Sequence, residues 1–420
     1  MWRYTDLLNQ DIQILLEIGL GIVTSLYGPF SAKNDAPTLK TLVFNILLPI
    51  SVMTDLGFVV DFRDGSIWRF IGSFLMMRAL VLLLDVVWAV ARKQSFSHIS
   101  MNWMVTSWVS TTILGPPMLQ ATLGQDYQIY GPIAAVSSVI FQLPLLILFF
   151  ELDAVPAKEE RLADQQVSLD AIEDSGAVDE REDEDKETMP LRMESHVFYK
   201  TRLSRRHQNL VVWNLVRMPL MWSIVGGVIL SVTTLGPKYL YPGTTFLHRK
   251  RFSTLSVYNL NILDAGPTYS PNCDYVPATG FIYLFFSTLQ KCLEPIALFS
   301  VGIVIVSNHP FRKGWIILIL YMLIKFILVP VIMVGCAKAF SLSEAEGRAA
   351  VLISVLPISP PVFALAGHYD YGLSEAVTNV VLGKLLFFPA VLAWEAFMNA
   401  VALFPVAMPT VSSVCPETTT

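Results

Sequence analysis

Long apolar runs recur through most of the chain, separated by short polar stretches. A helix needs roughly 20 apolar residues to cross the hydrocarbon core of a bilayer. We find such runs near residues 10–30, 39–60, 67–91, 101–120, 129–151, 208–235, 278–306, 314–337, 347–367 and 373–403. They lack the alternating hydrophobic period of barrel strands. Because lipid offers no hydrogen-bond partners to the backbone, a spanning segment that is not part of a barrel must be a helix. The pattern predicts an all-α integral membrane protein with about ten transmembrane helices.

Two of these runs are interrupted in the same way. GPPMLQATLGQDY begins at Gly115, and SPPVFALAGHYDY begins at Ser359. When the Pro-Pro pairs are superimposed, Asp126 falls on Asp370, and upstream FNILLPI falls on QKCLEPI. The chain is therefore predicted to be a duplication of a five-span unit. Because five is odd, the second unit enters the membrane in the opposite orientation, which gives the 5+5 inverted repeat common in secondary transporters.

The duplication divides the chain into a first repeat, 1–152, and a second repeat, 208–405, followed by a tail, 406–420. Between the repeats lies 153–207, whose middle, EDSGAVDEREDEDKE, is dense in like charge and poor in aromatic residues. Such composition predicts a disordered, solvated linker. The linker ends in KTRLSRRHQ, and basic residues beside a span favour the cytoplasm. We therefore expect a cytosolic linker and both termini on the other side of the membrane.

Composition then removes other classes of protein. With 54% hydrophobic and 15% charged residues, the chain is too apolar for a soluble domain. Its four cysteines lack metal-ligand or CxxC spacing, and the sequence holds no phosphate-binding loop, nucleophile elbow or HExxH. Its basic residues form no nucleic-acid-binding patch. We expect no enzyme activity and no cofactor, metal or nucleic acid. The expected surroundings are a lipid bilayer, that of the endoplasmic reticulum or the plasma membrane. Whether the protein forms a homodimer is left open.

The two interruptions predict a binding site. Proline inside a span frees backbone carbonyls and amides, which protein, water or a bound solute must satisfy. The alternative is that the prolines only kink packed helices, but two breaks at matched repeat positions favour a crossing near the bilayer midplane. The predicted substrate-binding residues flank the two breaks: Ser110, Thr111, Ile113, Pro116, Pro117, Pro357, Ile358, Ser359 and Pro360.

Two cations near span centres point to the charge of the substrate. An ionisable side chain inside the membrane is costly and marks either function or a buried pair. Arg78 and Lys325 occupy matched repeat positions, so we predict a joint role near the site. Half-helix N-termini add partial positive charge there, which favours an anionic substrate.

The other ionisable groups in the spans have alternative interpretations. Lys384 either pairs with an acid or faces a water-filled cavity. Lys291 and Glu294, three residues apart on one helix face, are expected to neutralise each other. His368 follows the second break, where an interfacial hydrogen-bonding role is favoured over that of a proton carrier.

Several of these stretches resemble the auxin efflux carrier family. They are FNILLPISVM, GPPMLQATLG, NLVRMP, LEPIALFSVGIVI and, most specifically, VLPISPPVFALAGHYDYGLSEAVTNVVLGKLLFFPAVL. The resemblance implies ten helices in a 5+5 inverted repeat with two broken crossover helices, similar to NhaA and the bile-acid transporters. It also implies export of a small organic anion, an indole or other carboxylate, by alternating access at the crossing of the fourth and ninth helices.

The chain departs from the plant carriers at identifiable positions. Ser110 stands where the resemblance implies a substrate-facing Asn, and Ile358 stands where those carriers have Gln. In the third span, Phe74 replaces an Asp and Arg78 replaces a Lys. A membrane sensor on the same fold, binding a lipid or metabolite and signalling through the linker or the loop 236–277, is the alternative function. The short tail PTVSSVCPETTT favours the transporter.

Overall fold

The computed structural model describes residues 5–28, 30, 34–59, 62, 65–154, 205–233, 280–307 and 315–405. Seven helices in these ranges are long and apolar enough to cross a membrane, and a bent pair, α9 and α10, raises the number to eight. The prediction of an all-α, multi-pass membrane protein is confirmed. The expected disordered linker, apart from its ends, the loop 236–277 and the tail lie outside the described residues.

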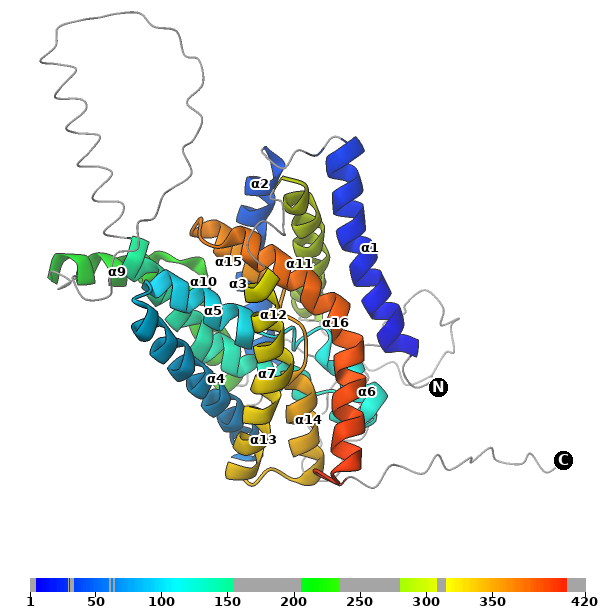
Figure 1. Ribbon diagram of the computed structural model, residues 1–420. Helices are drawn as coiled ribbons and strands as arrows, with labels where there is room; N and C mark the ends of the chain where they lie inside the picture. The colour runs from blue at the N-terminus through cyan, green and yellow to red at the C-terminus, as the bar shows by residue number, and fades with distance from the viewer. Residues whose placement is uncertain are drawn as a thin grey trace, which may run out of the picture.

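The N-terminal part of the chain contains four long helical segments and one broken one (Figure 1). Their bounds are α1 Thr5–Tyr27; α2 Asp35–Leu42, continued by η2 Val43–Leu47, α3 Leu48–Thr54 and η3 Asp55–Val59; α4 Gly65–Arg92; α5 Phe96–Ser107 with α6 Gly115–Thr122; and η4 Gln125–Tyr127 followed by α7 Tyr130–Ser137, η5 Ser138–Gln142 and helical residues 143–154.

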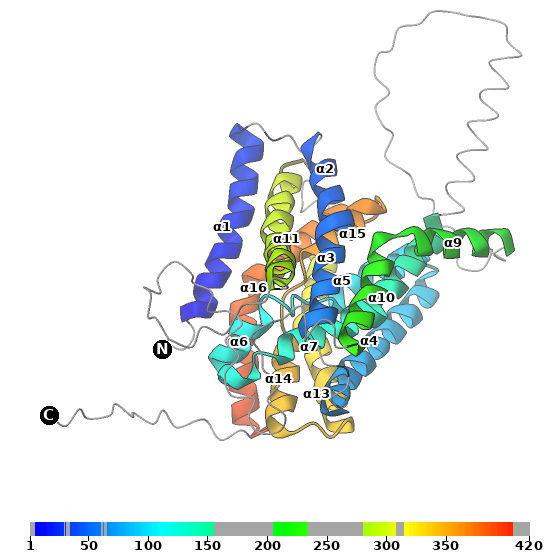
Figure 2. The ribbon, with the colours of Figure 1, turned by 180° about the vertical axis from the view of Figure 1, so that it is seen from behind.

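The C-terminal part follows a similar order after the linker. Its bounds are α9 Arg205–Arg217 with α10 Pro219–Val232; α11 Gly280–Ser307; α12 Trp315–Leu323, continued by η7 Ile324–Leu328 and α13 Val329–Ala339; α14 Glu344–Ser354 with α15 Pro361–His368; and α16 Leu373–Ala400. In Figures 1 and 2, the last turn of α16 lies at the lower end of the molecule, and α9 projects from its side.

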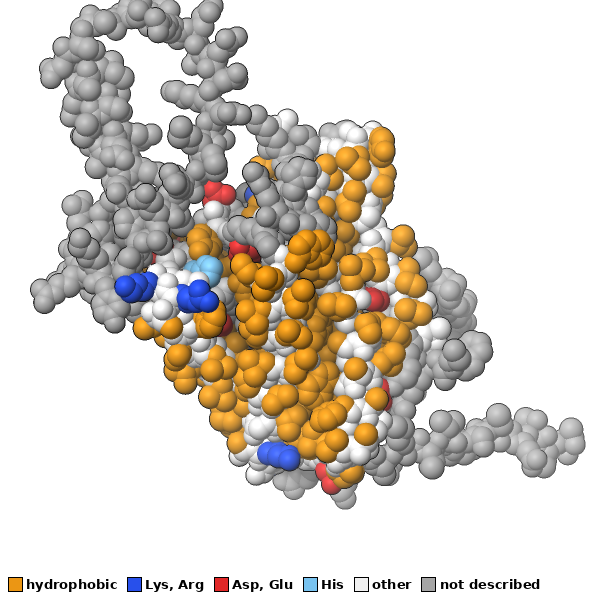
Figure 3. All heavy atoms as spheres, in the orientation of Figure 1, with side chains coloured by type: hydrophobic (Ala, Val, Ile, Leu, Met, Phe, Trp, Pro, Cys, Tyr) orange, Lys and Arg blue, Asp and Glu red, His pale blue; other side chains and the backbone are white. Residues whose placement is uncertain are grey.

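The outer surface of the helices is apolar. Figure 3 shows hydrophobic side chains over most of the described part of one face, with Lys and Arg side chains near its ends. Large hydrophobic residues such as Leu16, Val87, Trp222 and Ile316 are exposed. A water-soluble monomer rarely exposes so extended an apolar surface, whereas lipid solvates it without cost.

Helices α5 and α14 are each followed by an unwound stretch and then by a short helix that begins beside one of the Pro-Pro pairs. α5 ends at Ser107, and α6 begins at Gly115 with Pro116 in its first turn. α14 ends at Ser354, and α15 begins at Pro361. Proline is tolerated in a first turn, where its missing N–H has no intrahelical acceptor. Pro116, Pro117 and Pro361 therefore lie in the first turns of α6 and α15, and the residues before these helices, Pro357 among them, supply the free backbone.

Helices α1 and α11 lie side by side in both views and approach closely at two glycines (Figures 1 and 2). A Cβ on Gly302 would overlap the carbonyl oxygen of Ile18, and a Cβ on Gly21 would overlap the carbonyl oxygen of Phe299. Small residues at such positions let backbones pack in lipid, where no hydrophobic effect drives helices together. By contrast, a Cβ on Gly19 would meet nothing within 4 Å.

We expect Gly21→Ala to destabilise the protein by about 1–3 kcal/mol. The new methyl group would overlap the backbone of α11, which, unlike a side chain, cannot rotate away. Gly19→Ala, two residues away on the same helix, should be neutral or slightly stabilising, since alanine favours a helix. Thermal unfolding of the detergent-solubilised variants measures both. Equal midpoints for the two variants would contradict this packing.

Candidate functional site

The two unwound segments, 108–114 and 355–360, pair with each other. Val109 and Ile358 form an antiparallel β-bridge. The Ser110 N–H donates to the Pro357 carbonyl at 2.9 Å, and the Ser359 N–H donates to the Trp108 carbonyl at 3.1 Å. Backbone groups freed by one break are thus satisfied by the other, as burial away from water requires.

The two matched cations bind the carbonyl ends of the half-helices. Arg78 Nη1 donates to the Ser107 carbonyl at 2.7 Å, at the last residue of α5. Lys325 Nζ donates to the Ser354 carbonyl at 3.2 Å, at the last residue of α14. Both cationic side chains are fully buried. A helix C-terminus carries unpaired carbonyls and partial negative charge, so each cation stabilises the end of a broken helix.

Arg78 holds the larger of the two networks. Its Nε donates to Ser137 Oγ at 3.0 Å and its Nη2 to Ser138 Oγ at 2.6 Å, while Nη1 also contacts Gln142 Oε1. Gln142 in turn donates to Ser107 Oγ at 2.7 Å. The network joins α4, the end of α5, α7 and the π-helical turn η5, so a single guanidinium holds the end of α5 against its neighbours.

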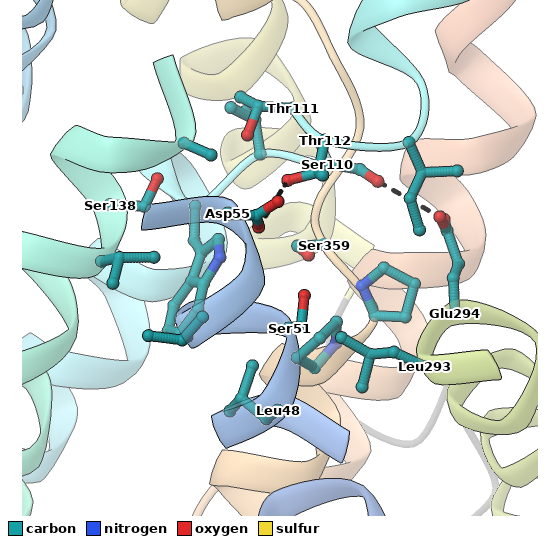
Figure 4. Close-up of a pocket in the computed structure, with 18 of the residues that line it drawn as sticks. Leu48, Ser51, Asp55, Ser110, Thr111, Thr112, Ser138, Leu293, Glu294 and Ser359 are labelled. Carbon is teal, nitrogen blue, oxygen red and sulfur yellow. Dashed lines mark hydrogen bonds between the residues drawn. The ribbon is translucent and has the colours of Figure 1, made fainter. Parts of the chain in front are cut away.

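A cavity of about 60 Å³ lies beside the paired segments (Figure 4). Its walls come from α3 and η3, both unwound segments, α7 and η5, α11 and the start of α15. Allowing about 10–15 Å³ for each water molecule, it holds roughly four to six waters. Its polar lining residues are Ser51, Asp55, Ser110, Thr111, Thr112, Ser138, Gln290, Glu294 and Ser359.

Five of the residues predicted to bind substrate line this cavity: Ser110, Thr111, Ile113, Ser359 and Pro360. The others lie next to it. Pro116 and Pro117 are in the first turn of α6, and Pro357 and Ile358 take part in the backbone pairing.

None of the four charge candidates, Arg78, Lys325, Lys384 and His368, lines the cavity. Arg78 and Lys325 bind the half-helix ends, and Lys384 reaches the cavity through Glu294. His368 ends α15, where its ring stacks on Phe44 with centroids 4.3 Å apart.

Lys384 is paired. Its Nζ lies 2.7 Å from Glu294 Oε1, and both side chains are buried. The expected Lys291–Glu294 pair is therefore wrong. Lys291 lies at the exposed surface of α11, while Glu294, 3% exposed, turns inward and meets a cation from α16. A buried carboxylate needs a partner that is buried with it, and helical spacing alone does not identify that partner.

Asp55 is a cavity residue that the sequence interpretation missed. Its Oδ1 accepts from Gln290 Nε2 at 2.6 Å, and its Oδ2 accepts from the Thr112 hydroxyl at 3.3 Å. It begins the π-helical turn η3, and such turns often occur at functional sites. The available signal was an acidic residue within the second apolar run, which by itself suggests a functional position.

Parts of the sequence match known proteins. Residues 273–395, which include all of α11 and continue into α16, match a family described as "Membrane transport protein". The chain is also 29% identical over 105 residues to auxin efflux carrier component 8 of Arabidopsis thaliana. The resemblance to the auxin efflux carrier family is confirmed. The aligned part is 25% of this chain and 29% of the length of that carrier.

Proposed function

We propose that this protein is a secondary transporter that exports a small organic anion, an indole or other carboxylate, by alternating access. The observation that carries the proposal is the backbone pairing of two unwound segments beside a polar cavity. Membrane transporters build their sites in this way, from discontinuous helices near the bilayer midplane. The match to a membrane transport family supports the same activity.

We further propose that the ten-helix, 5+5 inverted repeat underlies this activity. The matched breaks support it, as do the matched cations: Arg78 and Lys325 each lie on the span before a broken helix and bind the end of its first half. One repeat would then rock against the other around the paired segments.

The anionic substrate follows from the groups around the cavity. Ser110, Thr111 and Ser359 bring hydroxyl donors, and Ile113 brings apolar surface for the hydrocarbon part of the substrate. The N-terminal ends of α6 and α15 border the same region and contribute partial positive charge. A cavity of about 60 Å³ is smaller than an aromatic carboxylate requires, so binding involves movement of the surrounding helices.

The test is binding and uptake of indole-3-acetate, benzoate and butyrate by the purified chain in proteoliposomes. We expect the double variant Ser110→Ala, Ser359→Ala to bind the accepted anion roughly 10-fold or more weakly, because a hydrogen bond to a charged group contributes about 1.5–3 kcal/mol. The matched control is Ser73→Ala, which removes a buried hydroxyl that bonds only within α4.

Each outcome of this test supports or contradicts a stated part of the proposal. If no organic anion binds to the folded parent, the proposed function is wrong. If the double variant binds as the parent does, the cavity is not the site. Binding without translocation in either direction would favour the membrane sensor over the transporter.

A further inference from the structure

Asp55 is a buried carboxylate with neutral partners. It is 4% exposed and lies in the second span, and its two oxygens accept from an amide, Gln290, and a hydroxyl, Thr112. Among the described residues, no Lys, Arg or His forms an ion pair with it. An ionised carboxylate is costly at such a position unless a positive charge accompanies it.

The elements packed against Asp55 supply no such charge. Neither α3 nor α10 carries an ionisable residue, and the only one on α7 is Tyr130, whose hydroxyl donates to Glu346 at 3.2 Å. On α11 the ionisable residue facing the cavity is Glu294, which is neutralised by Lys384. The cavity therefore has a net charge of about −1 when Asp55 is ionised.

A second observation concerns an acceptor of the cavity that no donor reaches. Glu294 Oε2 is buried and has no hydrogen-bond partner, while Oε1 takes both Lys384 Nζ and the Ser110 hydroxyl. Figure 4 shows Asp55 and Glu294 reaching the unwound segment from opposite sides of the cavity. The lining thus holds two carboxylates and an unsatisfied acceptor, which is unsuited to an anion unless a positive charge enters as well.

We propose that Asp55 binds a proton together with the substrate, so that the cavity takes up one anion and one proton. This inference rests on the proposed function. Protonation forms one O–H bond on the Asp55 carboxyl group, removes the net negative charge and converts an acceptor into a donor for the anion. The proton returns to water when the anion leaves. A proton is favoured over a metal ion because no group of three acidic, histidine or cysteine side chains suited to a metal occurs in the described residues.

The test is proton uptake on anion binding. The purified full-length protein in nanodiscs, in weakly buffered, sodium-free solution with an indicator dye, is titrated with indole-3-acetate or benzoate. We expect up to one proton per bound anion and an affinity that falls as pH rises, approaching tenfold per pH unit once free Asp55 is ionised. Asp55→Asn, which is neutral at every pH, should bind without proton uptake and with a flat pH profile.

Asp85→Asn is the matched control. Asp85 lies on α4 outside the cavity, and its Oδ2 is buried without a hydrogen-bond partner, whereas both oxygens of Asp55 have one. This variant should take up protons as the parent does. Persistent uptake in Asp55→Asn, or a parent affinity independent of pH, overturns the proposal. If anion binding required sodium in the parent and lost that requirement in Asp55→Asn, the site would bind sodium, and the proposal of a bound proton would be wrong.

An anion-free measurement separates this inference from the proposed function. Infrared difference spectra between the parent and Asp55→Asn should contain the carbonyl stretch of a protonated carboxyl group, and this band should titrate with pH. If the band titrates but no anion binds, the transport proposal fails and the protonation of Asp55 stands. If anions bind but the band is absent at every pH, the coupling fails and the transport proposal stands.

Discussion

Replacing Lys384 by Met is expected to lower the free energy of unfolding by about 3–5 kcal/mol, because it leaves Glu294 buried without a compensating charge. The two side chains form a 2.7 Å ion pair in which Lys384 is fully buried. The double variant Glu294→Met, Lys384→Met should recover most of this loss, since a well-packed apolar pair replaces a desolvated ionic one at little net cost. Chemical or thermal unfolding in detergent measures all three proteins.

Lys291→Met provides the control for this experiment. Lys291 lies three residues from Glu294 along α11, yet it is exposed. Its replacement should change the free energy of unfolding by less than about 1 kcal/mol, as is usual for a substitution at an exposed position. If Lys291→Met were as damaging as Lys384→Met, the neighbour on the same helix, and not the residue on α16, would be the partner of Glu294.

The second large effect is expected at Arg78. Arg78→Met removes donors from the Ser107 carbonyl and from three buried side chains on α7 and η5. Each buried acceptor left unsatisfied costs about 1–3 kcal/mol, so the total should be about 4 kcal/mol or more. Anion binding should be lost together with stability, because the end of α5 sets the position of the first unwound segment.

Two comparisons make the Arg78 prediction specific. Lys325→Met, which removes the hydrogen bond to the Ser354 carbonyl, should cost about 1–3 kcal/mol. Arg217→Met, at an exposed arginine that lies over the Trp213 ring, should cost less than about 1 kcal/mol. Unfolding midpoints that fail to rank Arg78, Lys325 and Arg217 in this order would show that the half-helix ends do not depend on the cations.

The sequence by itself determined the membrane class and the places of the two proline-associated breaks, but not the bend between α9 and α10 inside the predicted span 208–235. The apolar run 67–91 corresponds to α4, Gly65–Arg92, because the length of apolar sequence decides what can lie in lipid. The two breaks were equally local, since proline restricts the backbone at its own position whatever packs around it. The matched positions of Arg78 and Lys325 were also visible, because a lone cation in an apolar run stands out without any knowledge of its contacts.

Only the tertiary structure decided which groups meet. Glu294 and Lys384 are 90 residues apart in sequence, and the helical pattern instead suggested Lys291. Likewise, the predicted site residues left Asp55 out, although it lines the same cavity as Ser110. Spacing along a helix determines which residues share a face, but the partner across that face depends on how other helices cross it. Burial then decides which charges must be neutralised, and burial is a property of the packed bundle.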